Sequence, residues 1–200
     1  MGDDQRESKR ALRRSLQARP AASGRAVSDA VSRLACERLV RLRHVVEARA
    51  VVAYAALDGE IDLRPALGYV AAPAMFWPCL DGETLQFRSA ALHELRPSGC
   101  HGLLEPAGGA RLTGSGAGVV FLVPGVAFDP AGARLGRGAG MYDRALSAFP
   151  SAVRIGVTCE ARLRPTLPTD RWDVPMHLVV TESRLLGRGA TRSMCKETHS

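Results

Sequence analysis

Residues 118–129 read GVVFLVPGVAFD, an apolar run that ends in a turn. Five apolar side chains stand in succession from Val119 to Val123, and Pro124 and Gly125 follow them directly. A strand that is apolar without alternation has both faces covered, which is typical of parallel sheets between layers of helices. This stretch therefore favours an α/β fold.

Shorter apolar runs on either side predict further strands, and amphipathic segments between them predict helices. The predicted strands cover residues 51–57, 75–78, 84–88, 102–106, 153–159 and 177–182. The predicted helices cover residues 5–19, 25–43, 62–70 and 141–149. The turn CLDGE joins the second and third of these strands, which predicts a hairpin. The order of elements predicts a three-layer α/β/α sandwich with a mostly parallel central sheet and a small antiparallel edge.

The length and composition fit one globular domain in a reducing compartment. The chain has 200 residues, of which 46% are hydrophobic, and its five scattered cysteines form no CxxC pair, which predicts free thiols. The opening MGDDQRESKR has no apolar core, and no run of eighteen apolar residues occurs, so we expect a cytoplasmic protein without a membrane partner. We expect a single domain over residues 1–182 and a mobile tail over residues 183–200, where periodicity is lost.

The formal net charge of +7 indicates an anionic partner, either nucleic acid or a phosphorylated small molecule. Aromatic residues make up only 5% of the chain, which leaves few platforms on which nucleic-acid bases could stack. A basic surface without a specific anion is the alternative, so charge alone does not identify the partner.

The segment RLGRGAGMYDR, residues 134–144, leads from the apolar strand into the predicted helix at 141–149. Its glycines alternate at Gly136, Gly138 and Gly140, and such a loop lets backbone N–H groups approach a phosphate. The arginines within it would add charge-assisted hydrogen bonds. The spacing matches neither GxGxxG nor a Walker loop. Taken alone, the segment is either a phosphate-binding loop or a flexible turn.

The longer stretch PGVAFDPAGARLGRGAGMYDR resembles the signature of the 5-formyltetrahydrofolate cyclo-ligase family, in which Pro-Gly-x-x-Phe-Asp leads into a loop of alternate glycines and then Tyr-Asp. The matching residues are Pro124, Gly125, Phe128, Asp129, Gly132, Arg134, Leu135, Gly136, Gly138, Gly140, Tyr142 and Asp143. The family often has a second Tyr where this chain has Met141. The resemblance extends from Lys9 to Glu182.

This resemblance implies an ATP site built from the first helix and the glycine loop. The implied ATP-binding residues are Lys9, Arg13, Arg134, Leu135, Gly136, Arg137, Gly138, Ala139, Gly140, Met141 and Tyr142. Arg137 lies inside the loop, and we expect it to be the catalytic residue that stabilises the transition state. From the residues alone, Lys9 and Arg13 share one helix face and also fit a solvated basic surface.

The resemblance also implies a folate site and a magnesium site. Glu60 matches the folate-binding Glu of the family, with Ala55 lining the same pocket, and a carboxylate can accept a pair of hydrogen bonds from a pterin. Asp143 and Asp173 match residues that hold Mg²⁺. From the residues alone, Glu60 also fits a turn and Asp173 a cap or turn.

Two further positions carry no assigned chemistry. Arg162 stands where family members often have Gln, which puts any role of that amide in doubt. Glu105 belongs to a Gly-x-x-Glu-Pro element that the family shares, and a structural role fits it equally well.

The activity implied by the resemblance is ATP- and Mg²⁺-dependent cyclisation of 5-formyltetrahydrofolate to 5,10-methenyltetrahydrofolate, with release of ADP and phosphate. The reaction would pass through a phosphorylated formyl group, an iminium phosphate. A polyglutamate tail on the reduced folate would suit the basic chain, and we expect a monomer that binds no nucleic acid. Two other classes stay open: an enzyme like a sugar-phosphate isomerase, which needs an acid/base group and no ATP, and a basic nucleic-acid-binding module.

Overall fold

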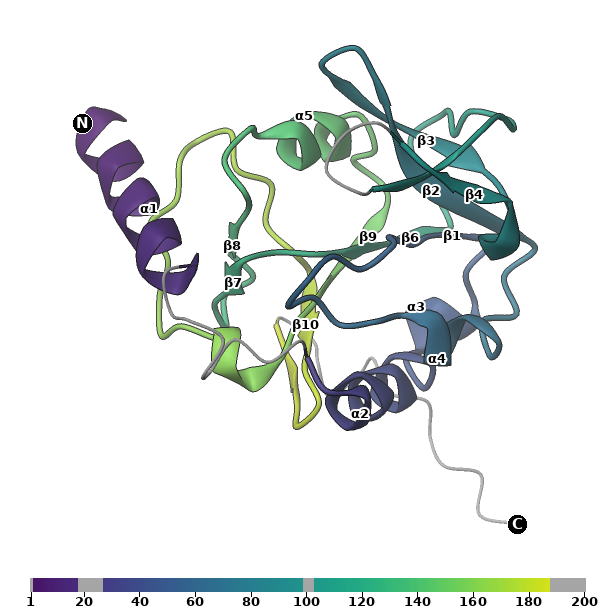
Figure 1. The fold of residues 1–200 in the computed structure, drawn as a ribbon, viewed down its shortest axis with the longest axis horizontal. Helices are drawn as coiled ribbons and strands as arrows, with labels where there is room; N and C mark the ends of the chain where they lie inside the picture. Colours follow the sequence, from purple (N-terminus) through teal and green to yellow (C-terminus); the bar gives the residue numbers. More distant parts are fainter. Residues whose placement is uncertain (1, 18–26, 99–102, 188–200) are drawn as a thin grey trace.

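The computed structural model describes residues 2–17, 27–98 and 103–187 (Figure 1). Its centre is a seven-stranded sheet in the order β11-β10-β9-β6-β1-β2-β3. The strands are β1 (Ala50–Val52), β2 (Ala74–Asp81), β3 (Thr84–Ser89), β6 (Val119–Val123), β9 (Val153–Val157), β10 (Leu178–Val180) and β11 (Leu185–Leu186). The five inner strands pair in parallel, whereas β3 and β11 pair antiparallel at the two edges. The predicted mostly parallel sheet and the predicted hairpin are therefore confirmed.

Helices cover both faces of this sheet, which confirms the three-layer prediction (Figure 1). The helices are α1 (Gly2–Gln17), α2 (Asp29–Leu39), α3 (Arg43–Val46), α4 (Arg64–Leu67) and α5 (Met141–Ser147), with 3₁₀ turns η1 (Leu92–Glu94) and η2 (Glu160–Arg162). Helices α2, α3 and α4 lie on one face and α5 on the other. Residues 18–19 and 25–26 of the predicted helices lie outside the described residues.

The apolar run that predicted the fold is β6, and all five of its side chains are buried. Val120 and Leu122 pack into the cluster beneath α2 and α3, whereas Phe121 and Val123 pack into the cluster beneath α5. Phe121 also packs edge-on against Phe87 of β3, with ring centroids 5.0 Å apart. A central parallel strand has two buried faces, which is why its sequence shows no alternation.

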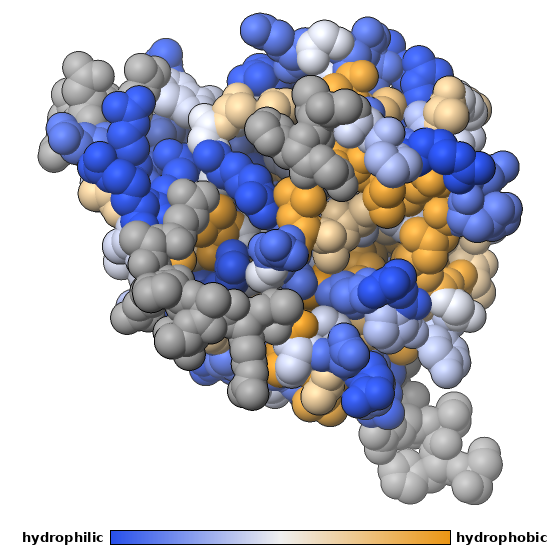
Figure 2. Space-filling view, viewed as in Figure 1, coloured by the Kyte–Doolittle hydropathy of each residue, from blue (hydrophilic) through white to orange (hydrophobic). Residues whose placement is uncertain are grey.

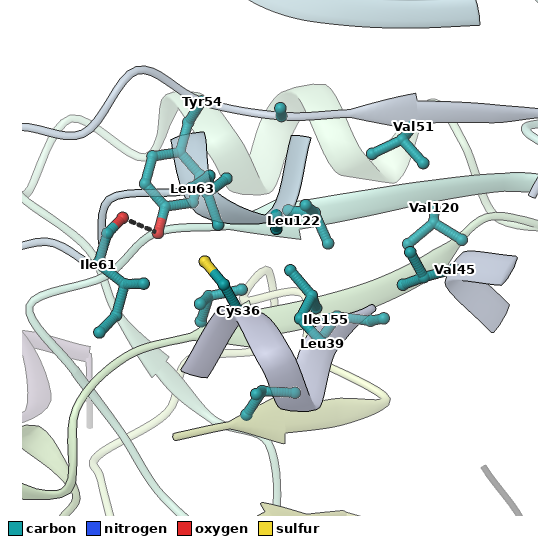
Figure 3. Packing of buried hydrophobic residues seen from close by; sticks show 14 of the residues in the cluster. Cys36, Leu39, Val45, Val51, Tyr54, Ile61, Leu63, Val120, Leu122 and Ile155 are labelled. Atoms are coloured by element: carbon teal, nitrogen blue, oxygen red, sulfur yellow. Dashed lines mark hydrogen bonds between the residues drawn. The ribbon is translucent and has the colours of Figure 1, made fainter. Parts of the chain in front are cut away.

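The cluster beneath α2 reaches the carboxyl end of β1 (Figure 3). There the buried Tyr54 donates its hydroxyl to the carbonyl of Ile61, 3.0 Å away. Burial raises the pKa of Tyr54 well above its ordinary value, so this hydroxyl stays protonated as a donor. Cys36 lies in the same cluster, and burial raises the pKa of its thiol to about 11. The chain leaving β1 is thus fixed by packing before it reaches Glu60.

Two small sheets flank the main one. Strand β4 (Leu95–Pro97) pairs antiparallel with β5 (Leu104–Pro106), and β7 (Ala127–Phe128) pairs antiparallel with β8 (Arg134–Leu135). Residue 102, the start of the predicted strand 102–106, lies outside the described residues. In Figure 1, α1 stands beside β7 and β8, away from the other helices, and Leu12 and Leu16 pack against the apolar cluster there.

The C-terminal segment departs from the predicted tail. Strand β11 falls within residues 183–200, and its backbone pairs with Val179 and Val180 of β10. The ordered sheet therefore continues beyond residue 182, while residues 188–200 lie outside the described part. Cys36, Cys79 and Cys159 are free thiols, as expected. Within the described ranges, no helix has the length and apolar character needed to span a bilayer.

Candidate active site

The chain leaving β1 and the chain leaving β6 open into one cavity of about 1970 Å³. Residues 54–58 and Glu60 follow β1 along one wall, and Pro124 and Gly125 follow β6. The glycine loop, residues of α1 and residues 170–175 form further parts of the wall, together with residues of β2, β3 and β5. Ligands of open α/β sheets bind at the carboxyl ends of parallel strands, which is where this cavity lies. Figure 2 shows hydrophobic residues near the centre of one face, with hydrophilic residues gathered around them.

The glycine loop, residues 136–140, connects β8 to α5 and adopts backbone angles that suit glycine. Gly138 has φ of 123° and Gly140, which precedes the first turn of α5, has φ of 63°. Both values lie where side chains other than hydrogen are strained. Arginines from outside fix the loop: Arg13 donates to the Gly136 carbonyl at 2.8 Å, and Arg144 donates to the Ala139 carbonyl at 2.9 Å. Hydrogen bonds and glycine backbone angles therefore give this loop a defined conformation, unlike that of a flexible turn.

Arg134 and Asp143 form an ion pair at the base of this loop. Arg134 Nη2 lies 2.9 Å from Asp143 Oδ2, and the guanidinium lies over the ring of Tyr142, 5.4 Å from its centroid. Asp143 Oδ1 accepts the amide of Val174 at 3.2 Å. The Arg134 side chain is only 5% exposed, and its Nε is a buried donor with no hydrogen-bond partner within the described residues. A buried donor without a partner costs free energy unless a ligand or water accepts from it.

Lys9 of α1 is buried against two carboxylates from the far end of the chain. Its Nζ lies 2.6 Å from Asp170 Oδ2 and 2.5 Å from Asp173 Oδ2. Asp173 Oδ2 also accepts the backbone amide of Asp170 at 2.7 Å. The solvated-face alternative therefore fails for Lys9. Arg13 has a different partner, the glycine loop, and burial lowers the pKa of its guanidinium.

Glu60 closes a turn and also faces the cavity. Its backbone amide donates to the Leu57 carbonyl at 2.9 Å, and its Oε2 accepts the Leu57 amide at 3.0 Å. Its Oε1 accepts from Arg137 Nη2 at 3.0 Å, although the Arg137 side chain is 54% exposed and that of Glu60 only 7%. The turn alternative thus describes the backbone of Glu60 and its Oε2, while its Oε1 joins the glycine loop. Ala55 lines the same cavity.

The two predicted magnesium ligands both line the cavity and both carry a cationic partner. No three His, Cys, Asp or Glu side chains of the described ranges gather closely enough to hold a metal by themselves. Mg²⁺ usually needs only one or two carboxylates, because waters and substrate phosphates supply its other oxygens. Asp143 and Asp173 therefore fit this ion in donor type and number. Sequence reasoning missed Asp170, although TDRWD places it three residues before Asp173.

Leu135 differs in its surroundings from the other predicted ATP-binding residues. Its side chain is 1% exposed and packs with Val126, Ala127 and Leu167, and it does not line the cavity. As the second residue of β8, it points into this small apolar cluster. The other predicted ATP-binding positions all line the cavity, Met141 included.

Asp129, which belongs to the same sequence signature, is structural. It is 4% exposed, and its carboxylate accepts the backbone amides of Ala131, Ala133 and Leu167 at 2.9–3.0 Å. The bonds from Ala131 and Ala133 shape the turn between β7 and β8, and the bond from Leu167 ties this turn to the segment after η2. Glu105 does line the cavity wall, at the end nearest β5.

The fold and the site define an α/β protein with a large, basic and carboxylate-lined ligand cavity at the carboxyl ends of its parallel strands. The model of the 5-formyltetrahydrofolate cyclo-ligase family matches residues 5–182. The chain belongs to this family, which confirms the resemblance seen in its sequence.

Characterised relatives and solved structures agree with this assignment. The 5-formyltetrahydrofolate cyclo-ligase of Escherichia coli K12 is 40% identical over 33% of this chain and 37% of that protein. The enzyme of the same name from Mycolicibacterium smegmatis is 47% identical over 32% of this chain and 34% of that protein. The aligned stretches thus span about a third of these relatives.

Two solved structures match over most of the chain. The 5,10-methenyltetrahydrofolate synthetase of Aquifex aeolicus has a TM-score of 0.72 and 28% identity, covering 96% of this chain and 97% of that one. The synthetase of Mycoplasma pneumoniae has a TM-score of 0.65, covering 87% of this chain and 98% of that one. At 19% identity, the second likeness concerns the fold alone.

Proposed function

We propose that this chain converts 5-formyltetrahydrofolate to 5,10-methenyltetrahydrofolate, with ATP as co-substrate and Mg²⁺ as cofactor. The observation that carries this proposal is one cavity that holds both a phosphate-type loop and a carboxylate of the kind that binds a pterin. Arg137 and Glu60 join these two walls directly, at 3.0 Å. Two ligands bound to the two walls would therefore be neighbours, as a transfer between them requires.

The size of the cavity supports two substrates. Pockets for a single drug-sized ligand measure roughly 300–1,000 Å³. This cavity measures about 1970 Å³, close to twice the upper end of that range. A nucleotide and a folate bound side by side would make use of such a volume.

The phosphate end of the cavity would bind the nucleotide through arginines and backbone amides. Arg134 Nε, buried and without a partner among the described residues, is a donor that a phosphate oxygen would satisfy. Arg137 is half exposed and can turn from Glu60 towards the group in transfer. Each charge-assisted hydrogen bond of this kind contributes roughly 1.5–3 kcal/mol. Lys9 and Arg13 would neutralise further charge from α1.

The folate end would be organised by Glu60. A pterin offers an amide N–H and an exocyclic amine side by side, and the two carboxylate oxygens match this pair of donors. The Glu60 Oε1 accepts from Arg137, and its Oε2 accepts from the Leu57 amide. A carboxylate oxygen can accept more than one hydrogen bond. Oε2 can therefore accept from the pterin as well as from the Leu57 amide, and Oε1 becomes available when Arg137 moves to a phosphate.

The chemistry follows from the substrate. The N5-formyl group is an amide, so its carbon is a poor electrophile for N10. The formyl oxygen attacks the terminal phosphorus of ATP, the bond to the bridging oxygen breaks, and ADP leaves. N10 then attacks the activated carbon, loses its proton, and inorganic phosphate departs with the former formyl oxygen. The protein has to align the groups and stabilise charge, and no covalent nucleophile is needed.

Asp143 and Asp173 are the residues that would hold Mg²⁺. The ion, when bound, would supply positive charge to the phosphate oxygens. Arg137 would add its own charge to the transferred group. The partners of the two aspartates are Arg134 and Lys9, so these cations would add positive charge beside the metal site.

The rival functions find less support at this site. An enzyme like a sugar-phosphate isomerase needs an acid/base group beside the loop, and no described His lines the cavity. The carboxylates nearest the loop are all paired with cations. A nucleic-acid-binding module would use an exposed basic face, whereas Lys9 is buried and forms ion pairs with two carboxylates.

A spectroscopic assay tests the proposal. Purified protein with 5-formyltetrahydrofolate, ATP and Mg²⁺ should develop the near-ultraviolet absorbance of the methenyl product. Omitting ATP or adding a chelator should abolish the signal, and ADP should form in step with it. A protein that leaves the absorbance unchanged with all three components present does not have this function.

A further inference from the structure

Arg162, where this chain departs from the family pattern, reaches across to the turn that carries Glu60. It ends the 3₁₀ turn η2, and its Nη1 donates to the Val126 carbonyl at 3.4 Å. Its Nη2 lies only 2.2 Å from the point where a Cβ on Gly59 would stand. The guanidinium is therefore packed between the chain that follows β6 and the chain that follows β1.

Gly59 makes this close approach possible. Its φ is 78°, a left-handed value that glycine adopts freely, and the absence of a side chain leaves room for the guanidinium plane. The next residue is Glu60, which closes the turn onto Leu57. A movement of Gly59 would tilt this turn and carry the carboxylate with it.

We propose that Arg162 is a positioning residue for Glu60, a role that rests on the proposed function. Its rigid, planar guanidinium packs against Gly59 and holds the turn in the position in which Glu60 faces the cavity. Arg137 acts from the other side, on the carboxylate itself. Two arginines thus orient Glu60. Arg162 packs against its turn, and Arg137 of the glycine loop donates to its carboxylate.

The test compares Arg162→Ala with Arg164→Ala. Arg164 lies on the same segment and is similarly half-buried, but its Nη1 donates to the nearby carbonyls of Ala161 and Leu163, and it does not line the cavity. Calorimetry would give the Kd of 5-formyltetrahydrofolate and of ATP for each variant. We expect Arg162→Ala to weaken folate binding about tenfold and to change ATP binding less than about twofold; for comparison, a misplacement of roughly 1 Å can cost up to about 10²-fold in rate. Arg164→Ala should change neither.

The same measurement in a Glu60→Gln background separates positioning from general damage. If Arg162 acts through Glu60, its removal should cost little further folate affinity once the carboxylate is gone, because coupled residues are not additive. A full tenfold loss in that background, or equal losses for both ligands, would overturn the proposal. Should Arg162→Ala not fold, Arg162→Lys provides the same comparison, because it keeps the charge and lacks the planar fork.

These outcomes are distinct from failure of the proposed function. A wild-type protein that binds the folate but does not cyclise it contradicts the reaction and leaves the positioning role standing. A wild-type protein that cyclises the folate while Arg162→Ala binds it as tightly as wild type supports the reaction and refutes the positioning role.

Discussion

Lys9 and Asp173 form an ion pair of 2.5 Å across 164 positions of sequence, with Asp170 as a second acceptor. The pair ties α1 to the loop before β10 and forms part of the cavity wall. A residue expected on the nucleotide and a residue expected on the metal therefore neutralise each other. Under the proposed function, Asp173 would hold the ion and Lys9 would contact a phosphate.

Lys9→Met should weaken ATP use far more than folate use. It removes a phosphate-neutralising charge and leaves two partly buried carboxylates without their cation, which repel the incoming anion. Loss of one charge-assisted contact of 1.5–3 kcal/mol corresponds to about 10- to 150-fold in kcat/KM for ATP. Arg14→Gln is the matched control, because Arg14 is exposed on the same helix and does not line the cavity. An unchanged kcat/KM for ATP in Lys9→Met would rule out this role.

Asp143→Asn and Asp129→Asn should separate activity from stability within one sequence signature. Asp143→Asn keeps the acceptor for the Val174 amide but loses the charge, so we expect a folded protein without turnover. Asp129→Asn places an NH₂ group among three backbone N–H donors, at a cost of about 1–3 kcal/mol, with activity largely kept at low temperature. Thermal unfolding and the absorbance assay measure both properties. Near-normal turnover of Asp143→Asn across magnesium concentrations would contradict the metal assignment.

The sheet could be predicted from the sequence because its central strands are short apolar runs with two buried faces. Strand β11 could not, because Leu185 and Leu186 stand among arginines and glycines, and their pairing with β10 is a long-range contact. The predicted helix 62–70 is shortened to Arg64–Leu67. Local propensity does not predict these two outcomes, because both depend on tertiary packing.

Most of the site residues assigned from the sequence line the cavity, but none of their pairings was predicted. Glu60 and Arg137 are 77 residues apart, and Lys9 and Asp170 are 161 apart, so no spacing rule connects them. Leu135 lies inside the glycine signature, yet its side chain points into an apolar cluster, which the signature alone does not indicate. Arg162 was recognised as a departure, but its contact with Gly59 depends on how two loops meet.

Glu60→Gln should weaken folate binding and spare ATP. The amide presents one acceptor and one donor, so it can no longer accept both hydrogen bonds of the pterin. It also releases Arg137, which stays available to phosphates, so ATP affinity should hold or rise slightly. Calorimetric titration of each ligand checks this. A variant that loses both affinities equally would contradict a pterin role for Glu60.

The stability of the C-terminal edge should depend on pH through Glu160. This carboxylate accepts from Arg184 Nη2 at 2.7 Å and from the Thr181 hydroxyl, and these contacts hold the β10–β11 turn against η2. The hydrogen bond from Arg184, opposed by partial burial, lowers the pKa of Glu160 below its ordinary value.

A carboxyl group whose pKa is lower in the folded state stabilises the protein above its unfolded pKa of about 4.3, and this contribution is lost as the pH falls through the folded pKa. Glu160→Gln should therefore be less stable than wild type near neutral pH, and the difference should shrink as the solution is acidified below about pH 4. Urea unfolding at several pH values measures this difference, and hydrogen exchange of the β11 amides reports whether the edge opens first. A difference that stays constant from neutral to acid pH would show that the charge on Glu160 is not what holds this edge.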